Sequence, residues 1–212
     1  MSDRPVSMAN RFRGFMPVVI DVETGGFNAR TDALLEMAAV FLEFDEDGIL
    51  HPTRSLNWQV DPFPNANIED ASLEVNGIKP YNPLRMARPE EDCLREMFKE
   101  IRTEMKLGGC KRSILVGHNA AFDLGFIKSA AARCKINNSP LHPFSTFDTV
   151  SLSGLIYGQT VLARSCQAAG LGWNGDKAHG ATYDTEQTAR LFCEIINAWA
   201  PHYVGVQQPG AK

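Results

Sequence analysis

Hydrophobic residues near the start of the chain form short runs that predict three consecutive β-strands. The runs cover residues 17–24, 34–44 and 58–60. The first is rich in β-branched side chains and is followed by two glycines, as expected for a buried strand. Residues 34–44 fit a helix or a strand, but the turn-forming sequence at 45–48 favours a strand hairpin. The third run stops before a proline, which cannot donate a backbone hydrogen bond.

Farther along the chain, apolar positions recur with a helical period. From Pro89 onward, apolar side chains three, four, seven and eleven residues apart form one stripe on a helix that ends at Gly108-Gly109. The other predicted elements are helices at residues 122–134, 149–169 and 182–199 and strands at residues 114–116 and 144–148. Together these elements predict an α/β fold in which helices cover a mixed sheet.

The size and composition of the chain indicate one globular domain. Of its 212 residues, 44% are hydrophobic and 22% are charged, so we expect a single domain over 1–212 with a basic lead-in at 1–15 and a flexible tail at 201–212. The net charge of -4 leaves the class of partner open, because local patches decide binding.

The pattern of cysteines and apolar runs bears on the compartment. The five cysteines show no CxxC pair, which disfavours a disulfide framework and a zinc site and favours reduced thiols. No run approaches the ~18 apolar residues of a membrane span, and no apolar signal region follows the N-terminus. We therefore expect a cytoplasmic protein without a membrane partner.

Two carboxylates lie near the end of the first predicted strand. Asp21 and Glu23 are two residues apart, so the alternation of a strand directs both side chains to the same face. Paired carboxylates repel unless one is protonated or a hard cation such as Mg²⁺ lies between them. A solvated strand end explains an isolated pair more simply, so this pair alone does not define a site.

Two further acids stand at predicted helix starts. Asp123 ends the segment His-Asn-Ala-Ala-Phe-Asp, where a strand is followed by a helix. His179 lies in a glycine-containing loop, and Asp184 follows it by five residues in the first turn of the next predicted helix. Each has a structural alternative, since acids cap helices or complement the helix dipole. A histidine near a helix start is also more often structural than catalytic. In this order, however, the three segments are far more specific than any one alone.

This ordered set resembles the three sequence motifs of the DEDDh superfamily of 3′-5′ exonucleases. The resemblance extends over nearly the whole chain to the ribonuclease T family. It is carried by Val-Ile-Asp21-Val-Glu23-Thr, by residues 118–123, by His179 with Asp184, and by residues 11–15, 76–78, 144–149 and 158–160. It implies an α/β, RNase H-like fold with a mixed five-stranded sheet flanked by helices. It also implies a homodimer.

The resemblance implies an activity and its cofactor. The implied activity is 3′ trimming of transfer RNA and other stable RNAs to nucleoside 5′-monophosphates, with single-stranded DNA as an additional substrate. The implied ligands of two Mg²⁺ ions, or Mn²⁺ as a substitute, are Asp21, Glu23, Asp123 and Asp184. Two such cations about 3.5–4 Å apart assist both the attacking water and the leaving oxygen. The implied general base is His179, an imidazole suited to neutral pH, and Asp148 is expected to support the site from a neighbouring strand.

Three phenylalanines adjoin these segments, and the resemblance places all of them in the pocket for the terminal nucleotide. They are Phe27, Phe122 and Phe144. Aromatic faces stack on any base and contribute about 1–3 kcal/mol per base, although core packing is an equal alternative for Phe122. Val75 departs from the family pattern, which has an aromatic residue before Asn-Gly-Ile, so base preference there stays open.

Two basic clusters lie far from the motifs in sequence. Their members are Arg11, Arg13, Lys106, Lys111 and Arg112. Phosphate binding is a common reason for such clusters on an acidic protein, and ordinary surface charge is the alternative. The resemblance implies that the basic surface of one subunit feeds RNA into the active site of the other. Asn137 stands where we expect a basic residue, which would reduce that surface.

Other functions compete with this interpretation. Residues 170–175 match the GxGxxG pattern of dinucleotide-binding enzymes, but they follow a predicted helix rather than a strand, so we expect a connecting loop. A DNA-proofreading exonuclease would share every catalytic residue, and only relative rates on RNA and DNA ends distinguish it. The complete acidic set argues against a catalytically silent RNA-binding or scaffold protein.

Overall fold

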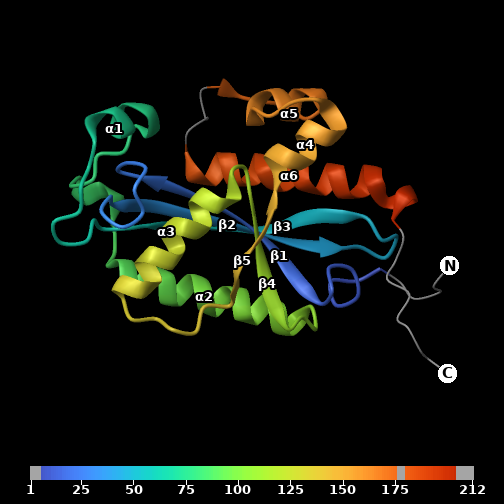
Figure 1. Ribbon diagram of the computed structural model, residues 1–212, viewed down its shortest axis with the longest axis horizontal. Helices are drawn as coiled ribbons and strands as arrows, with labels where there is room; N and C mark the ends of the chain where they lie inside the picture. The colour runs from blue at the N-terminus through green and yellow to red at the C-terminus, as the bar shows by residue number, and fades with distance from the viewer. Residues whose placement is uncertain (1–5, 176–179, 204–212) are drawn as a thin grey trace.

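The computed structural model describes residues 6–175 and 180–203 and shows a central sheet with helices on both faces (Figure 1). In this part of the chain, the five-stranded sheet has the order β3-β2-β1-β4-β5. Its strands are β1 (Phe15–Thr24), β2 (Leu34–Phe44), β3 (Leu50–Gln59), β4 (Arg112–Gly117) and β5 (Leu141–Asp148). The first three strands form an antiparallel meander, whereas β4 runs parallel to β1 and β5 parallel to β4. The predicted mixed five-stranded sheet is confirmed.

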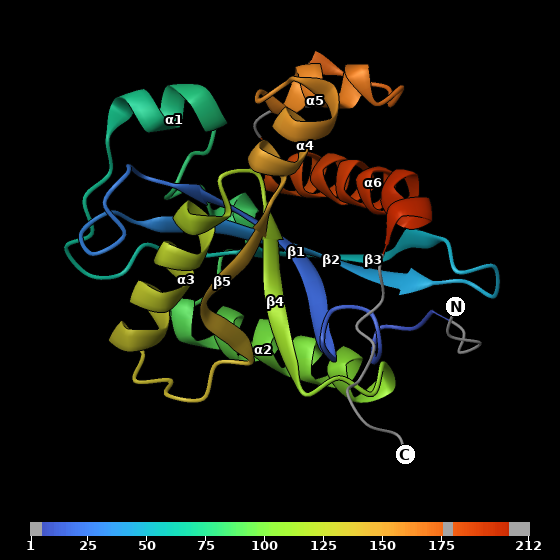
Figure 2. The same cartoon turned by 45° about the vertical axis from the view of Figure 1, so that its right-hand side comes forward.

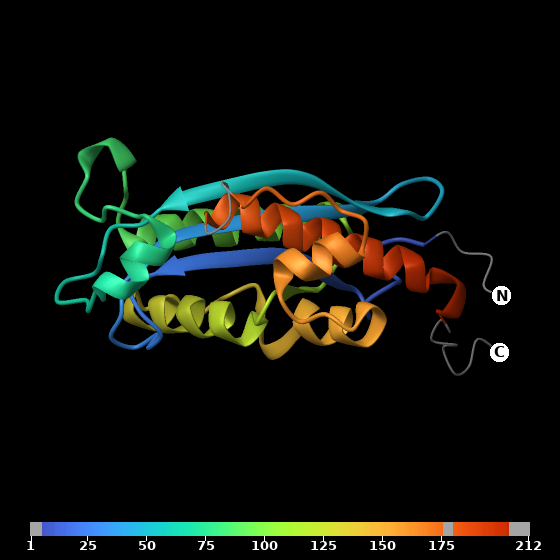
Figure 3. The ribbon, with the colours of Figure 1, turned by 90° about the horizontal axis from the view of Figure 1, so that it is seen from above.

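Helices form the outer layers of the fold. They are α1 (Asp70–Asn76), α2 (Glu90–Leu107), α3 (Ala120–Arg133), α4 (Thr149–Tyr157), α5 (Leu162–Ala168) and α6 (Ala181–Trp199), with 3₁₀ turns η1 (Pro83–Arg85) and η3 (Ala200–His202). α2 and α3 pack on one side of the sheet, and α6 lies across β1, β2 and β3 on the other (Figure 2). α4 and α5 pack against α6 and lie farther from the sheet than α6 does (Figure 1), and they lie along one side of α6 when the molecule is seen from above (Figure 3).

The core explains why the central strands have uninterrupted hydrophobic runs. Val18, Val19 and Ile20 of β1 have no exposed surface, because helices cover both faces and alternate side chains are therefore buried on either side. The edge strand β3 has only scattered buried positions and several exposed ones. α6 packs over the edge strand as well as over the central ones.

The structure corrects several predicted boundaries. β3 begins at Leu50, well before residue 58, and includes a proline, which an edge strand tolerates because one row of its amides needs no partner. β5 begins at Leu141 rather than at residue 144, and α3 begins at Ala120 rather than at residue 122. α1 was not predicted. It is short and has no buried residue, so its sequence lacks a hydrophobic stripe.

Further expectations from the sequence can be compared with the described residues. All five cysteines are free thiols, and three of them are buried. Residues 170–175 follow α5 and contain no strand, so they do not form a dinucleotide-binding unit. None of the described helices is both long and apolar enough to cross a membrane.

The packing of α6 on the sheet generates a prediction about stability. Phe192 of α6 has no exposed surface, and its ring lies 5.4 Å from that of Phe147 and 6.3 Å from that of Phe12. Phe192→Ala should therefore lower the free energy of unfolding by about 3–5 kcal/mol, measured by urea titration with circular dichroism. Trp199→Ala on the same helix, where 47% of the side chain is exposed, should cost about 1 kcal/mol or less. Equal losses would contradict this view of the core.

Candidate active site

Four carboxylates from three elements line one pocket at an edge of the sheet. Because β1 and β4 are parallel, the chain leaves both strands on the same side. Asp21 and Glu23 lie near the end of β1, Asp123 lies in the first turn of α3, and Asp184 lies in the first turn of α6. All four line a pocket of about 350 Å³. The structure thus brings together the four predicted acids.

Asp123 is held in place by the backbone around it. The amide N–H of Val22 donates to its Oδ1 at 3.0 Å, which links the start of α3 to β1. Gly117 permits this approach, because a Cβ there would lie 3.1 Å from Asp123 Oδ2 and 3.0 Å from the Cα of Ala120. The close turn between β4 and α3 therefore depends on glycine at this position.

Asp148 supports the same turn from the neighbouring strand. Its Oδ1 accepts hydrogen bonds from the amide of Asn119 at 3.3 Å and from that of Val150 at 2.9 Å. The first bond holds Asn119, which adopts a positive φ of 73° before α3, and the second caps α4. Asp148 therefore connects β5 to the segment that presents Asp123.

The clustered acids raise one another's pKa values. Burial raises the pKa of Asp21 well above its usual value, and the charges of Asp123, Glu23, Asp184 and Glu36 raise it further. Burial also raises the pKa of Glu23 to about 8, with contributions from Asp184, Glu36 and Asp123. The pKa of Asp123 rises to about 7, mainly through burial. The pocket is thus strongly unfavourable for several uncompensated negative charges.

The chemistry of the pocket fits a divalent cation. Its four carboxylates are oxygen ligands, which hard cations such as Mg²⁺ and Mn²⁺ prefer. A cation among them would offset the repulsion that raises their pKa values. Among residues 6–175 and 180–203, no three His, Cys, Asp or Glu side chains lie close enough together to form a complete metal site.

The predicted aromatic residues divide into two groups. Phe27 and Phe122 line the acidic pocket, and their ring centroids lie 6.2 Å apart in an edge-to-face contact. Phe27 is 83% exposed, so its face is open to solvent. Phe144 does not line the pocket but packs edge-to-face on His142 at 4.6 Å. The predicted general base, His179, lies outside the described residues.

The two basic clusters lie side by side in the fold. The amide of Lys111 donates to the carbonyl oxygen of Gly14 at 2.9 Å, and Arg112 pairs with Phe15 where β4 meets β1. This places the basic residues at the beginning of β1, whereas Asp21 lies six residues later. At about 3.3 Å per residue, the separation along the strand is about 20 Å. The structure therefore separates the basic surface from the acidic pocket of the same chain.

Two residues at the site were not assigned a role from the sequence. The side chain of Asn76 hydrogen-bonds to Glu23, which partly opposes the rise in the pKa of that carboxyl caused by burial, and it also donates to the carbonyl oxygen of Thr24 at 3.1 Å. His118 lines the pocket and bonds through its two ring nitrogens to Thr149 Oγ1 at 2.9 Å and to the carbonyl oxygen of Thr160 at 3.0 Å. Their partners are distant in sequence, so local patterns could not indicate these roles.

The raised pKa values generate a prediction about pH. The pKa of Glu23 is about 4.5 in the unfolded chain and about 8 in the folded protein. Between these two pH values the folded protein therefore binds more protons than the unfolded chain. Stability in EDTA should therefore fall as pH rises through this window. Added Mg²⁺ should stabilise most at the alkaline end. Thermal unfolding with and without Mg²⁺ measures both trends, and Glu23→Gln should flatten them. If the stability of the wild-type protein fell with rising pH only in the presence of Mg²⁺, this account would be contradicted.

Comparison with known proteins shows the family to which the chain is similar. A family model described as RNase T exonuclease matches residues 18–192. The chain is 54% identical to ribonuclease T of Vibrio campbellii and 52% identical to ribonuclease T of Vibrio parahaemolyticus. Each similarity extends over 200 residues and covers 94% of both chains.

Solved structures with low sequence identity share the fold. A 3′-exonuclease solved in a study of 3′-end recognition of a histone mRNA stem-loop matches with a TM-score of 0.67 and 17% identity, over 86% of this chain and 63% of that one. Exonuclease I of E. coli in complex with a dT13 oligonucleotide matches with a TM-score of 0.64 and 14% identity. The match covers 89% of this chain but only 42% of that longer chain. From the family match and the near-complete similarity to both relatives, the chain belongs to the RNase T family of exonucleases.

Proposed function

We propose that the protein is a metal-dependent 3′-5′ exoribonuclease. One observation carries the proposal: four carboxylates from β1, α3 and α6 line a single pocket. The burial and mutual repulsion that raise their pKa values favour a bound cation. The identity of 54% with a ribonuclease T supports RNA rather than DNA as the main substrate.

Each predicted residue has a role in this reaction. The proposed metal ligands are Asp21, Glu23, Asp123 and Asp184. Two bound Mg²⁺ ions, or Mn²⁺ in their place, would supply positive charge for the attacking water and the leaving 3′ oxygen. His179 would accept the proton of the water as its oxygen bonds to the terminal phosphorus. The bond from phosphorus to the 3′ oxygen of the preceding nucleotide then breaks, which releases a nucleoside 5′-monophosphate.

Aromatic faces beside the acids support binding of a single-stranded 3′ end. Phe27 and Phe122 line the pocket, and such faces stack on bases of any sequence. Phe144 is 80% exposed and would bind a nucleotide farther from the pocket. We propose transfer RNA and other stable RNAs as substrates, with single-stranded DNA as a further one. The free thiols of all five cysteines fit action in the reducing cytoplasm.

The separation of charge in the fold supports a homodimer with shared sites. The proposed phosphate-binding residues are Arg11, Arg13, Lys106 and Arg112. Arg11 and Arg13 precede β1, Arg112 begins β4, and Lys106 lies in the last turn of α2. Arg112 pairs with Phe15, which is about 20 Å along the strand from Asp21. A short RNA end held in the pocket would therefore meet the basic surface of a second subunit more readily than that of its own. We propose that each active site is completed by the partner in this way.

The metal site can be tested with an isosteric substitution. Asp21→Asn removes a charge and a ligand but keeps the shape of the side chain, so it should abolish turnover of a 3′-labelled RNA while leaving folding and RNA binding largely intact. Turnover by the wild-type protein should require Mg²⁺ or Mn²⁺. Asp45→Asn is the matched control, because Asp45 is exposed in the turn between β2 and β3, its side chain accepts hydrogen bonds from the amides of Asp47 and Ile49, and the variant should retain near-normal turnover. Near-normal rates in metal-free buffer would reject the proposed mechanism.

The shared site predicts complementation between two inactive subunits. One subunit carries Asp21→Asn, and the other carries alanine at Arg11, Arg13, Lys106 and Arg112. A mixed dimer contains one intact composite site, so it should recover up to about half of the wild-type rate per mixed dimer. Neither homodimer should do so. Wild-type activity from an isolated monomer, or no recovery after confirmed subunit exchange, would reject the shared arrangement.

A further inference from the structure

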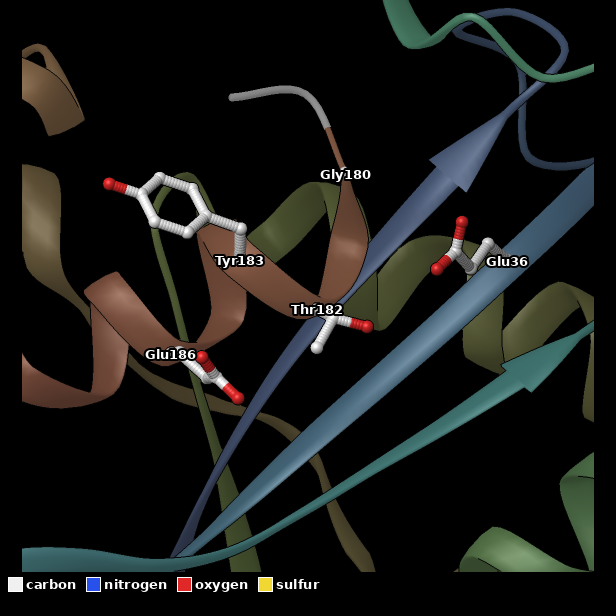
Figure 4. A pocket seen from close by; sticks show the side chains of 5 residues that line it. All are labelled: Glu36, Gly180, Thr182, Tyr183 and Glu186. Atoms are coloured by element: carbon white, nitrogen blue, oxygen red, sulfur yellow. The ribbon is translucent and has the colours of Figure 1, made fainter. Parts of the chain in front are cut away.

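A fifth acid, Glu36, lies beside the four carboxylates but outside their pocket. On β2 it pairs directly with Glu23 of β1, and directly opposed residues in a sheet point to the same face. The charge of Glu36 also raises the pKa values of Glu23 and Asp21. Glu36 lines a second pocket of about 350 Å³ together with residues from the start of α6 (Figure 4). It is therefore close enough to influence the metal site without being one of its proposed ligands.

The side-chain amide of Asn57 has three hydrogen-bonding partners, and the carboxylate of Glu36 is one of them. The Nδ2 group of Asn57, on β3, donates to Glu36 Oε1 and also to Thr182 Oγ1, the latter at 2.8 Å. The Oδ1 of Asn57 accepts a hydrogen bond from Gln59 Nε2 at 3.3 Å. Gln59 in turn accepts from Arg85 Nε at 3.1 Å. These bonds fix the orientation of Asn57 even though β3 is an exposed edge strand.

Asn57 connects the sheet to the part of α6 that carries a proposed metal ligand. Thr182 and Asp184 both lie in the first turn of α6. The N-cap of this helix is Gly180, which has no side chain to cap the first turn. Figure 4 shows Thr182 on the side of the helix that faces Glu36. The bond from Asn57 therefore ties this turn to β3 where the helix has no cap of its own.

The register of the sheet explains why this tie affects the active site. Asp21, Ala38 and Asn57 stand side by side on β1, β2 and β3. Ala38 is fully buried and small, so it leaves room for α6 to approach between its two polar neighbours. A shift of the first turn of α6 at Asn57 would thus also move Asp184 relative to Asp21.

We propose that Asn57, oriented by Glu36 and Gln59, is a positioning residue that holds the first turn of α6 in place. In this role it determines the position of Asp184 relative to the carboxylates of β1. The inference rests on the proposed metal-dependent function. It concerns the geometry of the site, so it makes a prediction for metal binding as well as for catalysis.

The test is direct titration with Mn²⁺ by calorimetry, with kcat and KM measured on a short RNA. Asn57→Ala should raise the dissociation constant for Mn²⁺ by about tenfold, the low end for residues outside the ligand shell. It should lower kcat by a comparable factor while changing KM for RNA by less than about twofold. Asn57→Asp should be worse than Asn57→Ala, because it sets a carboxylate against Glu36. The reverse order would overturn the proposal.

The far end of the same helix supplies a matched control. The side chain of Asn197 accepts from the amide of Leu50 at 2.9 Å and donates to its carbonyl oxygen at 2.8 Å, so it also ties α6 to β3. Asn197→Ala should lower the melting temperature but leave the Mn²⁺ dissociation constant unchanged. Equal weakening of Mn²⁺ binding by Asn57→Ala and Asn197→Ala would show a general effect of stability and overturn the positioning role.

A second pair of variants keeps the inference testable if Asn57→Ala does not fold. Thr182→Val removes the hydroxyl that accepts from Asn57, and Thr182→Ser retains it. Only the valine variant should bind Mn²⁺ more weakly, and identical behaviour of the two would overturn the proposal. A wild-type protein that binds no Mn²⁺ would instead reject the metal site itself. Equal Mn²⁺ binding by wild type and Asn57→Ala would reject only the role of Asn57.

Discussion

Mutual repulsion among carboxylates at one edge of the sheet is the constraint on which the rest of the site depends. Burial and neighbouring charges raise the pKa values of Asp21, Glu23 and Asp123 together. Groups that repel in this way do not hold one another in place, so the surrounding structure must do so. The central strand β1 supplies the most rigid part of that support, because it is hydrogen-bonded on both sides and its core residues are fully buried.

The other acids are attached to β1 by polar contacts of different kinds. The backbone of Val22 holds Asp123, and glycine at position 117 allows the two to approach. Asn76 bonds to Glu23 and to the carbonyl oxygen of Thr24, which also fastens the end of α1 to the end of β1. α6 is fastened to β3 near both of its ends, through Asn57 and Asn197. Each acid thus has support from outside the pocket.

The sheet also separates the two kinds of charge that a nuclease needs. Its acidic edge lies where β1 and β4 end, and the basic residues lie where these parallel strands begin. If both charges met in one chain, salt bridges between them would compete with a metal ion and with phosphates. Their separation avoids such salt bridges within one chain, and the proposed homodimer would bring the two groups together across its interface.

The sequence by itself determined the central elements and the identity of the acids. The runs in β1 and β4 are uninterrupted because both faces of these strands are buried, and the stripe of α2 is periodic because one face of this helix is buried. The spacing of Asp21 and Glu23 fixed their common face, and the order of the motifs identified Asp123 and Asp184. These features are local, so they can be recognised without knowing which segments meet in space.

The tertiary structure alone decided the rest. The extent of β3 and the existence of α1 were missed, because an exposed edge strand and a helix without buried residues lack strong hydrophobic patterns. Phe122 lines the pocket but Phe144 does not, although both adjoin a motif. The contacts of Asn57 with Glu36 and Thr182 join residues 21 and 125 positions apart. Hydrogen bonds between such distant residues depend on how helix and sheet pack, which no local pattern encodes.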